Sequence, residues 1–183
     1  MKSSRFVSKC IVLVGVICLT VSCKSTLKTQ SANLDMETIT LETPCPEDME
    51  CSVKVIPDTR LSLQDNNADL QFITDTDYNV IAITINRIVP ETVADAQYRE
   101  ELYVEVPKQR SELHLEGQDL QKVNAIFGRF CFCPQPAVGY VKIDHGKLDI
   151  ANGLVHFVFD NSEEAKFDRV LKEIKASYKI HDE

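Results

Sequence analysis

The sequence predicts a mainly β protein: a single antiparallel β-sandwich or partly open barrel with one or two short helices and disulfide cross-links. Three observations carry this prediction. Apolar and polar residues alternate over many short segments, as they do in half-buried strands. Helical periodicity is clear in only two short segments, and region 37–183, which has the length of one domain, contains four cysteines. Many short strands with few helices are typical of sandwiches and barrels.

Two segments, 80–89 and 98–106, show the clearest strand pattern. Their apolar faces are formed by Ile81, Ile83 and Ile85 and by Leu102, Val104 and Val106, respectively. Shorter strands are predicted at 51–55, 61–64, 70–73, 112–115, 140–143 and 154–159. The His145-Gly146 pair stands where two strands would reverse, so residues 138–150 are predicted to form a hairpin.

Two segments are predicted to be helical. Residues 119–127 place apolar side chains on one helical face, with Asp119 as N-cap and Gly128 as a left-handed stop. Residues 162–172 have a second helical pattern, after which residues 174–180 alternate as a strand does. The first helix would lead directly into Phe130-Cys131-Phe132-Cys133 (FCFC).

The N-terminus has the organisation of a signal peptide, because Lys2, Arg5 and Lys9 precede an apolar run at 11–21. That run is about half the length that a membrane-spanning helix needs. Its end resembles a bacterial lipoprotein signal, in which a small residue, here Ser22, precedes a cysteine that is diacylated before cleavage. This resemblance implies lipidation of Cys23; an ordinary secretory signal is the alternative. The predicted organisation is a signal peptide at 1–22, a lipidated cysteine and flexible tether at 23–36, and one β-rich domain at 37–183.

The charge of the chain argues against nucleic-acid partners. Its net charge at pH 7 is −8, and removal of the basic signal peptide makes it more negative. An acidic surface repels phosphate backbones and anionic headgroups, so membrane attachment would come from the lipid alone. In the lipoproteins that the signal resembles, aspartate after the cysteine directs retention in the inner membrane. Lys24 and Ser25 stand here instead, which favours the periplasmic face of the outer membrane.

The FCFC stretch raises the question of whether its cysteines form a site or a cross-link. In an extended strand Cys131 and Cys133 share one face and the phenylalanines take the other, so we expect Phe130 and Phe132 in the core. The two cysteine Cα atoms would then be nearly 7 Å apart, at the limit for a mutual disulfide.

Disulfides between the two cysteine-containing segments are therefore predicted. In an oxidising compartment four cysteines suggest two bonds. A Cys45–Cys51 bond would close a small loop through Pro46, so cross-pairing of Cys45 and Cys51 with Cys131 and Cys133 is favoured, without a choice of connectivity. Each bond would close a loop of roughly 80 residues and contribute on the order of 4 kcal/mol. The alternative is a Cu or Zn site on the Cys131 and Cys133 thiolates, with or without the other two cysteines.

No catalytic residue or cofactor is predicted. The chain lacks the serine-nucleophile, zinc-protease and phosphate-loop motifs. Its histidines, at positions 114, 145, 156 and 181, have no helical ligand spacing and are interpreted as surface or half-buried residues. Arg129 is expected to pair with Glu100 or Glu101 if its strand lies beside 98–106; otherwise it could meet an anionic ligand or partner.

The combination of the lipidation-like signal, TPCPEDMEC, YREELYVEV and GRFCFC resembles a group of small flavobacterial-type lipoproteins of uncharacterised function. This resemblance implies that the four cysteines and Gly128-Arg129 belong to the group's pattern, and it implies no activity. The predicted function is a lipid-anchored, non-catalytic binding or structural module of the cell envelope, whose partner is an unidentified envelope protein or ligand. The alternative is a metal-handling lipoprotein.

Overall fold

β-Strands dominate the part of the chain that this computed structural model describes, namely residues 36–64, 69–90, 96–110, 112–132, 139–160 and 169–180. All of these residues belong to one compact unit, Ser31–Glu183. The predicted signal peptide and Cys23 lie outside the described residues. The first strand begins at Met36, one residue before the predicted start of the domain.

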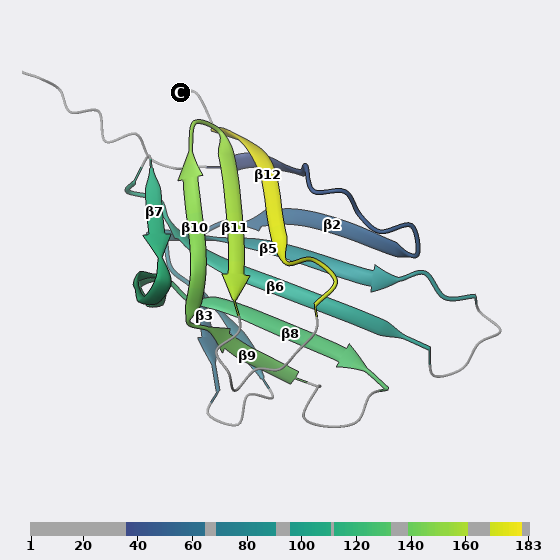
Figure 1. Cartoon of the computed structure of the whole chain (residues 1–183). Helices are drawn as coiled ribbons and strands as arrows, with labels where there is room; N and C mark the ends of the chain where they lie inside the picture. Colours follow the sequence, from purple (N-terminus) through teal and green to yellow (C-terminus); the bar gives the residue numbers. More distant parts are fainter. Residues whose placement is uncertain are drawn as a thin grey trace, which may run out of the picture. The chain divides into compact units, whose positions relative to one another are not determined.

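Two five-stranded antiparallel sheets form the two layers of the domain (Figure 1). The first has the order β1 (Met36–Leu41), β12 (Glu173–Ile180), β11 (Leu154–Asp160), β10 (His145–Ala151) and β7 (Leu113–Glu116). The second has the order β2 (Met49–Ile56), β5 (Tyr78–Arg87), β6 (Tyr98–Pro107), β8 (Ala125–Cys131) and β9 (Gly139–Ile143). A two-stranded sheet, β3 (Thr59–Leu63) with β4 (Leu70–Thr74), packs on the second sheet. The predicted fold class is confirmed.

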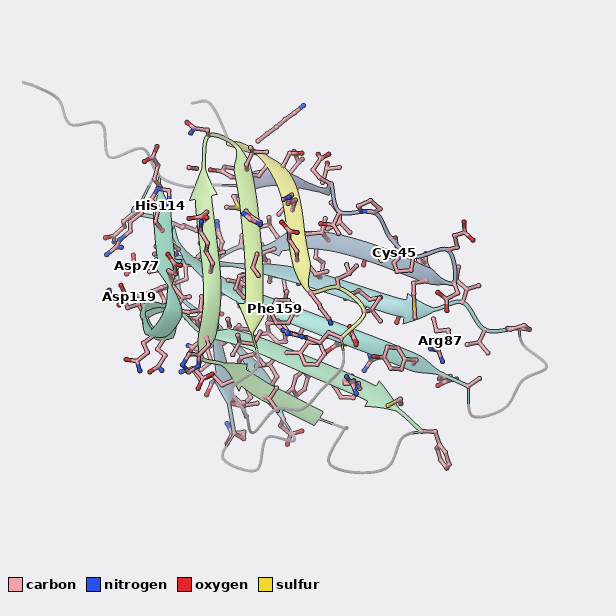
Figure 2. All side chains as sticks on the ribbon, in the orientation of Figure 1. Cys45, Asp77, Arg87, His114, Asp119 and Phe159 are labelled. Carbon is pink, nitrogen blue, oxygen red and sulfur yellow. A yellow bond between two sulfur atoms is a disulfide. The ribbon has the colours of Figure 1, made fainter. Side chains whose placement is uncertain are left out.

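The main core lies between the two five-stranded sheets. It includes Ile81, Ile83, Ile85, Leu102, Val104 and Phe127 from the second sheet and Leu148, Ile150, Val155, Phe157, Phe159 and Ile174 from the first. Burial of one such side chain contributes about 1.5–3 kcal/mol, so this layer supplies most of the apolar stabilisation. Phe159 is labelled in Figure 2. The period-two pattern of β5 and β6 therefore predicted the inward faces correctly.

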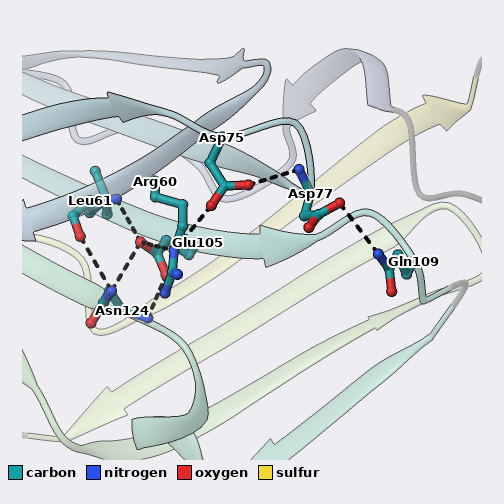
Figure 3. A network of polar contacts seen from close by, with 7 residues as sticks. All are labelled: Arg60, Leu61, Asp75, Asp77, Glu105, Gln109 and Asn124. Atoms are coloured by element: carbon teal, nitrogen blue, oxygen red, sulfur yellow. Dashed lines mark hydrogen bonds and ion pairs between the residues drawn. The ribbon is translucent and has the colours of Figure 1, made fainter.

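The outer face of β5 is buried as well, which alternation alone did not predict. Val80 and Ala82 point away from the main core and are only 0% and 2% exposed. The β3–β4 hairpin covers this part of the sheet, and Leu61 forms a second apolar cluster with Val80 and Ile126. Polar contacts that surround Glu105 fasten the hairpin to β6 (Figure 3).

The hairpin predicted over residues 138–150 is wrong. Strand β9 pairs with β8 in the second sheet, whereas β10 pairs with β7 and β11 in the first. The chain therefore crosses between the layers near Asp144. The tight hairpin joins β10 to β11 through Asn152 and Gly153, which both have positive φ, 52° and 77°. Such angles suit a two-residue turn in which asparagine and glycine are favoured.

The predicted helix at 119–127 is also wrong in its bounds and its ends. A 3-10 helix, η1, spans Gly117–Lys122, with Glu116 at the N-cap position, and β8 begins at Ala125. Gly128 lies inside β8 and is not a helix stop. Of the second predicted helix, residues 162–168 lie outside the described part, and 169–172 are not helical. Strand β12 follows as predicted.

Candidate binding cleft

The FCFC strand has the opposite orientation from the one predicted. Ala125, Phe127 and Arg129 face the first sheet, while Ile126 and Phe130 lie on the outer face. Phe132 is 85% exposed, so neither phenylalanine of this motif enters the main core. The outer face accepts Phe130 because it packs edge-on against Tyr140, with ring centroids 5.1 Å apart.

Gly128 is required by the Tyr140 ring. A Cβ atom at position 128 would lie 2.6 Å from Cδ1 and Cε1 of Tyr140, closer than nonbonded atoms approach. Strand pairing places Tyr140 directly opposite Gly128, and Glu101 is the partner of Gly128 on the other side. Tyr140 fills the missing side-chain volume and donates its hydroxyl hydrogen to Glu101 Oε2 at 2.7 Å.

The predicted cross-pairing of the cysteines is wrong, because Cys45 is bonded to Cys51, with Cα atoms 5.8 Å apart. The small loop is possible because residues 47–48 form a turn, and the Met49 N–H donates to the Pro46 carbonyl oxygen at 3.0 Å. Cys131 is also disulfide-bonded. Cys133 lies outside the described residues. The bond formed by Cys45 therefore joins β2 to its own preceding loop and not to the FCFC strand.

The predicted pairing of Arg129 is confirmed. Strand β8 lies beside β6, and Arg129 is the direct cross-strand partner of Glu100. The Arg129 Nε atom is 3.9 Å from Glu100 Oε1, and both side chains are largely buried. The Tyr98 hydroxyl also donates to Glu100 Oε1.

Glu100 also connects the two layers. Its carboxylate accepts a hydrogen bond from the Val170 N–H, at 3.1 Å to Oε2, just before β12. Only 2% of Glu100 is exposed, and this burial raises its pKa despite the hydrogen bonds and nearby arginines. Burial likewise raises the pKa of Tyr98. The group is thus a polar site on the inner face, at the end where β6 begins.

A cleft of about 640 Å³ lies at this end of the second sheet. Its described lining comes from the end of β5, the start of β6 and the end of β8, with adjoining residues. These are Asn86, Arg87, Val89, Gln97, Tyr98, Arg99, Phe130, Cys131 and Phe132. None of the described lining residues is acidic, although the chain has 28 Asp and Glu against 20 Lys and Arg.

Two arginines supply the positive charge of the cleft, and each lies over an aromatic ring. The Arg87 guanidinium carbon is 5.1 Å from the Tyr98 ring centroid, and that of Arg99 is 4.6 Å from the Phe130 ring centroid. Strand pairing aligns Asn86, Arg99 and Phe130 across β5, β6 and β8. This stacking limits the orientations of both guanidinium groups.

Each of the two arginines lies near a carboxylate, but the distances of the two contacts differ. Arg99 Nε is 3.1 Å from Glu101 Oε1, so one edge of this guanidinium group is already paired with a carboxylate. Glu101 also accepts hydrogen bonds from the Tyr103 and Tyr140 hydroxyls, at 3.1 and 2.7 Å. Burial raises the pKa of both tyrosines, so they are neutral donors at physiological pH. In the described chain, Arg87 has only one carboxylate nearby, with 4.0 Å between its Nε and Asp48 Oδ2.

The described histidines lie at the surface beside carboxylates. His114 contacts Asp149, His145 contacts Asp144 and His156 contacts Glu173, at 3.1, 2.8 and 2.8 Å. No group of three potential metal-ligating side chains occurs among the described residues. The Cu or Zn alternative therefore stays a hypothesis that concerns the reduced protein. His181 lies outside the described part of the chain.

The sequence patterns assign no role in a site to the cleft residues outside the FCFC strand. Arg87, Tyr98 and Arg99 belong to no motif, and Val89 and Gln97 lie beyond the bounds of β5 and β6. The signal that could have found them is register: once β5, β6 and β8 are taken as neighbours, their ends gather two arginines and three aromatic residues.

Comparison with protein-family models, with curated proteins and with solved structures found no match to this chain. Within the described residues, no helix has both the length and the apolar character needed to cross a membrane.

Proposed function

We propose that this protein is a lipid-anchored, non-catalytic binding module of the cell envelope, which faces the periplasm from the outer membrane. Three features of the N-terminus support the anchor: the basic start, the apolar run at 11–21, and Ser22 before Cys23. The partner is an envelope protein or ligand, and the cleft formed by β5, β6 and β8 is its binding surface.

One observation carries the binding role. In an acidic protein, the described lining of this cleft places two ring-stacked arginines side by side, and Arg87 has only an exposed carboxylate 4.0 Å away. Such a concentration of positive charge attracts and orients negatively charged groups. Phe132 is 85% exposed at this cleft, and exposed large aromatic side chains are common in interaction sites.

The anchor is tested by Cys23→Ala. We expect the wild-type protein to incorporate labelled fatty acid and to sediment with outer membranes, whereas the variant does neither. If the Cys23→Ala variant takes up no label but sediments with outer membranes as completely as the wild type, lipid anchoring is contradicted.

The binding surface is tested with a photo-reactive phenylalanine analogue incorporated at position 132 or at position 154. Leu154 is a matched control because it is also exposed, by 56%, but lies in the first sheet. We expect irradiation of cells to give a defined cross-linked species from position 132 only, and Arg87→Gln to weaken it. Equal cross-linking from both positions would contradict a binding role for the cleft.

A further inference from the structure

The ligand chemistry of the cleft follows first from its charge. A second cleft, of about 540 Å³, is also basic, since its lining includes Lys147, Arg169 and Lys172. That second cleft contains Glu116, and Lys147 Nζ is held 2.9 Å from Asp149 Oδ2. In the first cleft Arg99 is likewise held by a carboxylate, 3.1 Å from Glu101 Oε1, but the nearest described carboxylate to Arg87 is at 4.0 Å and exposed to solvent. Arg87 is therefore the cation of the first cleft that an anion can contact with the least competition.

The geometry of the arginines favours a planar acceptor. A guanidinium presents two parallel N–H groups that match the two oxygens of a carboxylate. Both arginines are stacked on rings, Arg87 on Tyr98 and Arg99 on Phe130. Less rotational freedom is then lost when an anion binds.

The remaining lining favours an apolar group next to the charge. Phe132 and Val89 provide apolar surface, while the amides of Asn86 and Gln97 can donate to and accept from a peptide group. An isolated inorganic anion would leave this surface exposed to water. A carboxylate attached to an apolar side chain and a peptide group has a chemical counterpart in each of these three kinds of lining residue.

We infer that the cleft formed by β5, β6 and β8 binds a carboxylate next to an apolar group, as at the C-terminal end of a peptide, with Arg87 and Arg99 as its charged contacts. The inference rests on the proposed function, because it names the ligand class for the same binding surface. It also identifies the partner as one that presents a free chain end.

The test is calorimetric titration of the full-length protein, in neutral detergent and a buffer free of carboxylate and phosphate. Three probes are compared: N-acetyl-phenylalanine, its uncharged amide, and inorganic phosphate. We expect saturable binding of N-acetyl-phenylalanine, with the amide about tenfold weaker because the charged hydrogen bonds are lost. Phosphate should also bind more weakly than N-acetyl-phenylalanine, since it leaves the apolar surface uncovered.

Variants locate the binding. Arg87→Gln should weaken N-acetyl-phenylalanine binding about tenfold, and the fold should be retained, because the interactions of this side chain with described residues are a 4.0 Å approach to exposed Asp48 and stacking on the Tyr98 ring. Arg99→Gln should weaken it similarly, with an unfolding temperature measured alongside because Glu101 loses a partner. Lys172→Gln is the matched control, since it removes one positive charge from the second cleft, and its affinity should stay within twofold.

Equal affinity for the amide, tighter binding of phosphate, or unchanged binding by Arg87→Gln would overturn the inference, as would no binding of N-acetyl-phenylalanine. The cross-link from position 132 separates this failure from that of the proposed function. If the cross-link forms but the carboxylate is not bound, only the ligand class is wrong; if the position-specific cross-link is absent, the binding role itself is wrong.

Discussion

The two ends of strand β6 each bury a glutamate, but the surroundings of these glutamates differ. Glu105 lies near the end of the strand, under the β3–β4 hairpin, and is 1% exposed. Glu100 lies near its beginning, beside the cleft, and is 2% exposed. The two side chains point to opposite faces of the sheet, so one strand supports two separate polar sites.

Glu105 is surrounded by donors from the folded backbone and from one amide side chain (Figure 3). It accepts hydrogen bonds from the Leu61 N–H at 2.6 Å and from Asn124 Nδ2 at 3.0 Å, both at Oε1. Asn124 Nδ2 also donates to the Leu61 carbonyl oxygen at 3.3 Å, and Arg60 Nε lies 3.7 Å from Glu105 Oε1. This arrangement fixes the hairpin to the sheet.

Glu100 instead has a tyrosine hydroxyl, two arginines and one backbone N–H as neighbours. Its surroundings do not compensate fully for burial, which is why its pKa is raised. The burial of a carboxylate therefore does not by itself define its role. Because Glu105 binds a backbone N–H of the β3–β4 hairpin, it fixes the hairpin on the sheet. Glu100 instead positions the Tyr98 and Arg129 side chains beneath the cleft.

The largest effect is expected from Glu105→Ala. Removal of this carboxylate leaves the buried Leu61 N–H without its acceptor and takes from the Asn124 amide the shorter of its two hydrogen bonds, which should lower the free energy of unfolding by about 3–5 kcal/mol. Urea denaturation measures this change. Exposed Glu50→Ala on β2 is the control and should change stability by less than about 0.5 kcal/mol. A decrease of less than about 1 kcal/mol in the free energy of unfolding of Glu105→Ala would contradict the role of Glu105 in fixing the hairpin on the sheet.

A smaller, pH-dependent effect is expected from Glu100→Gln. Because the folded protein raises the pKa of Glu100, this group contributes stability below the pKa of an unfolded glutamate, about 4.3, and loses it as pH rises through the folded pKa. Glutamine does not ionise, so the variant lacks this pH-dependent contribution to stability. The unfolding free energy of Glu100→Gln minus that of the wild type should therefore increase between pH 4 and pH 7, on the order of 1 kcal/mol. A difference that is flat or falls with pH would contradict the assignment.

Gly128→Ala should perturb the cleft end with an effect of about 1–3 kcal/mol, because the new methyl group must displace the Tyr140 ring. Displacement would also weaken the hydrogen bond from Tyr140 to Glu101, which anchors Arg99. A double-mutant cycle with Tyr140→Ala measures the coupling. The cost of Gly128→Ala should nearly vanish once the ring is absent; if it persists, the glycine is required for another reason.

Much of the fold could be predicted from the sequence because burial on one face imposes a period of two. The inward isoleucines of β5 and the inward residues of β6 were identified in this way. The pairing of Arg129 with Glu100 or Glu101 could also be predicted for neighbouring strands, and the register of β8 with β6 selects Glu100. In both cases the controlling interactions lie within one strand or between adjacent strands.

The orientation of the FCFC strand could not be predicted by the same rule. Alternation identifies two faces, but the choice between them depends on what covers each face. Here the inner face takes Arg129 because Glu100 lies opposite it, and the outer face takes Phe130 because Tyr140 fills the space above Gly128. Both partners come from other strands, so the local sequence contains no record of them.

In two places where the prediction was wrong, the hairpin and the cysteine pairing, the local sequence does contain a signal for the observed structure. Asn152-Gly153 is the sequence of a two-residue hairpin turn, and its positive φ angles confirm that role, whereas His145-Gly146 lies where the chain changes sheets. Pro46 lies inside the small loop that a Cys45–Cys51 bond closes, and it precedes a turn that brings the two cysteines together. In both places turn chemistry determined the outcome.

Asp48→Asn should have the smallest effect on stability and thereby separates the two ends of β6 most sharply. Its carboxylate lies 4.0 Å from Arg87, and the two side chains are 68% and 44% exposed. Exposed ion pairs contribute little, so the free energy of unfolding should change by less than about 0.5 kcal/mol.

Affinity for N-acetyl-phenylalanine should nevertheless rise about twofold in low salt, because Asp48→Asn removes a negative charge that competes for Arg87, and the gain should disappear at high salt. Asp119→Asn is the matched control, since it removes an exposed negative charge from η1, away from Arg87 in Figure 2. An equal gain in affinity for both variants would mean that the net charge of the protein, and not the charge at the cleft, controls binding. A gain confined to Asp48→Asn, together with the stability loss of Glu105→Ala, would show that charge serves binding at one end of the strand and folding at the other.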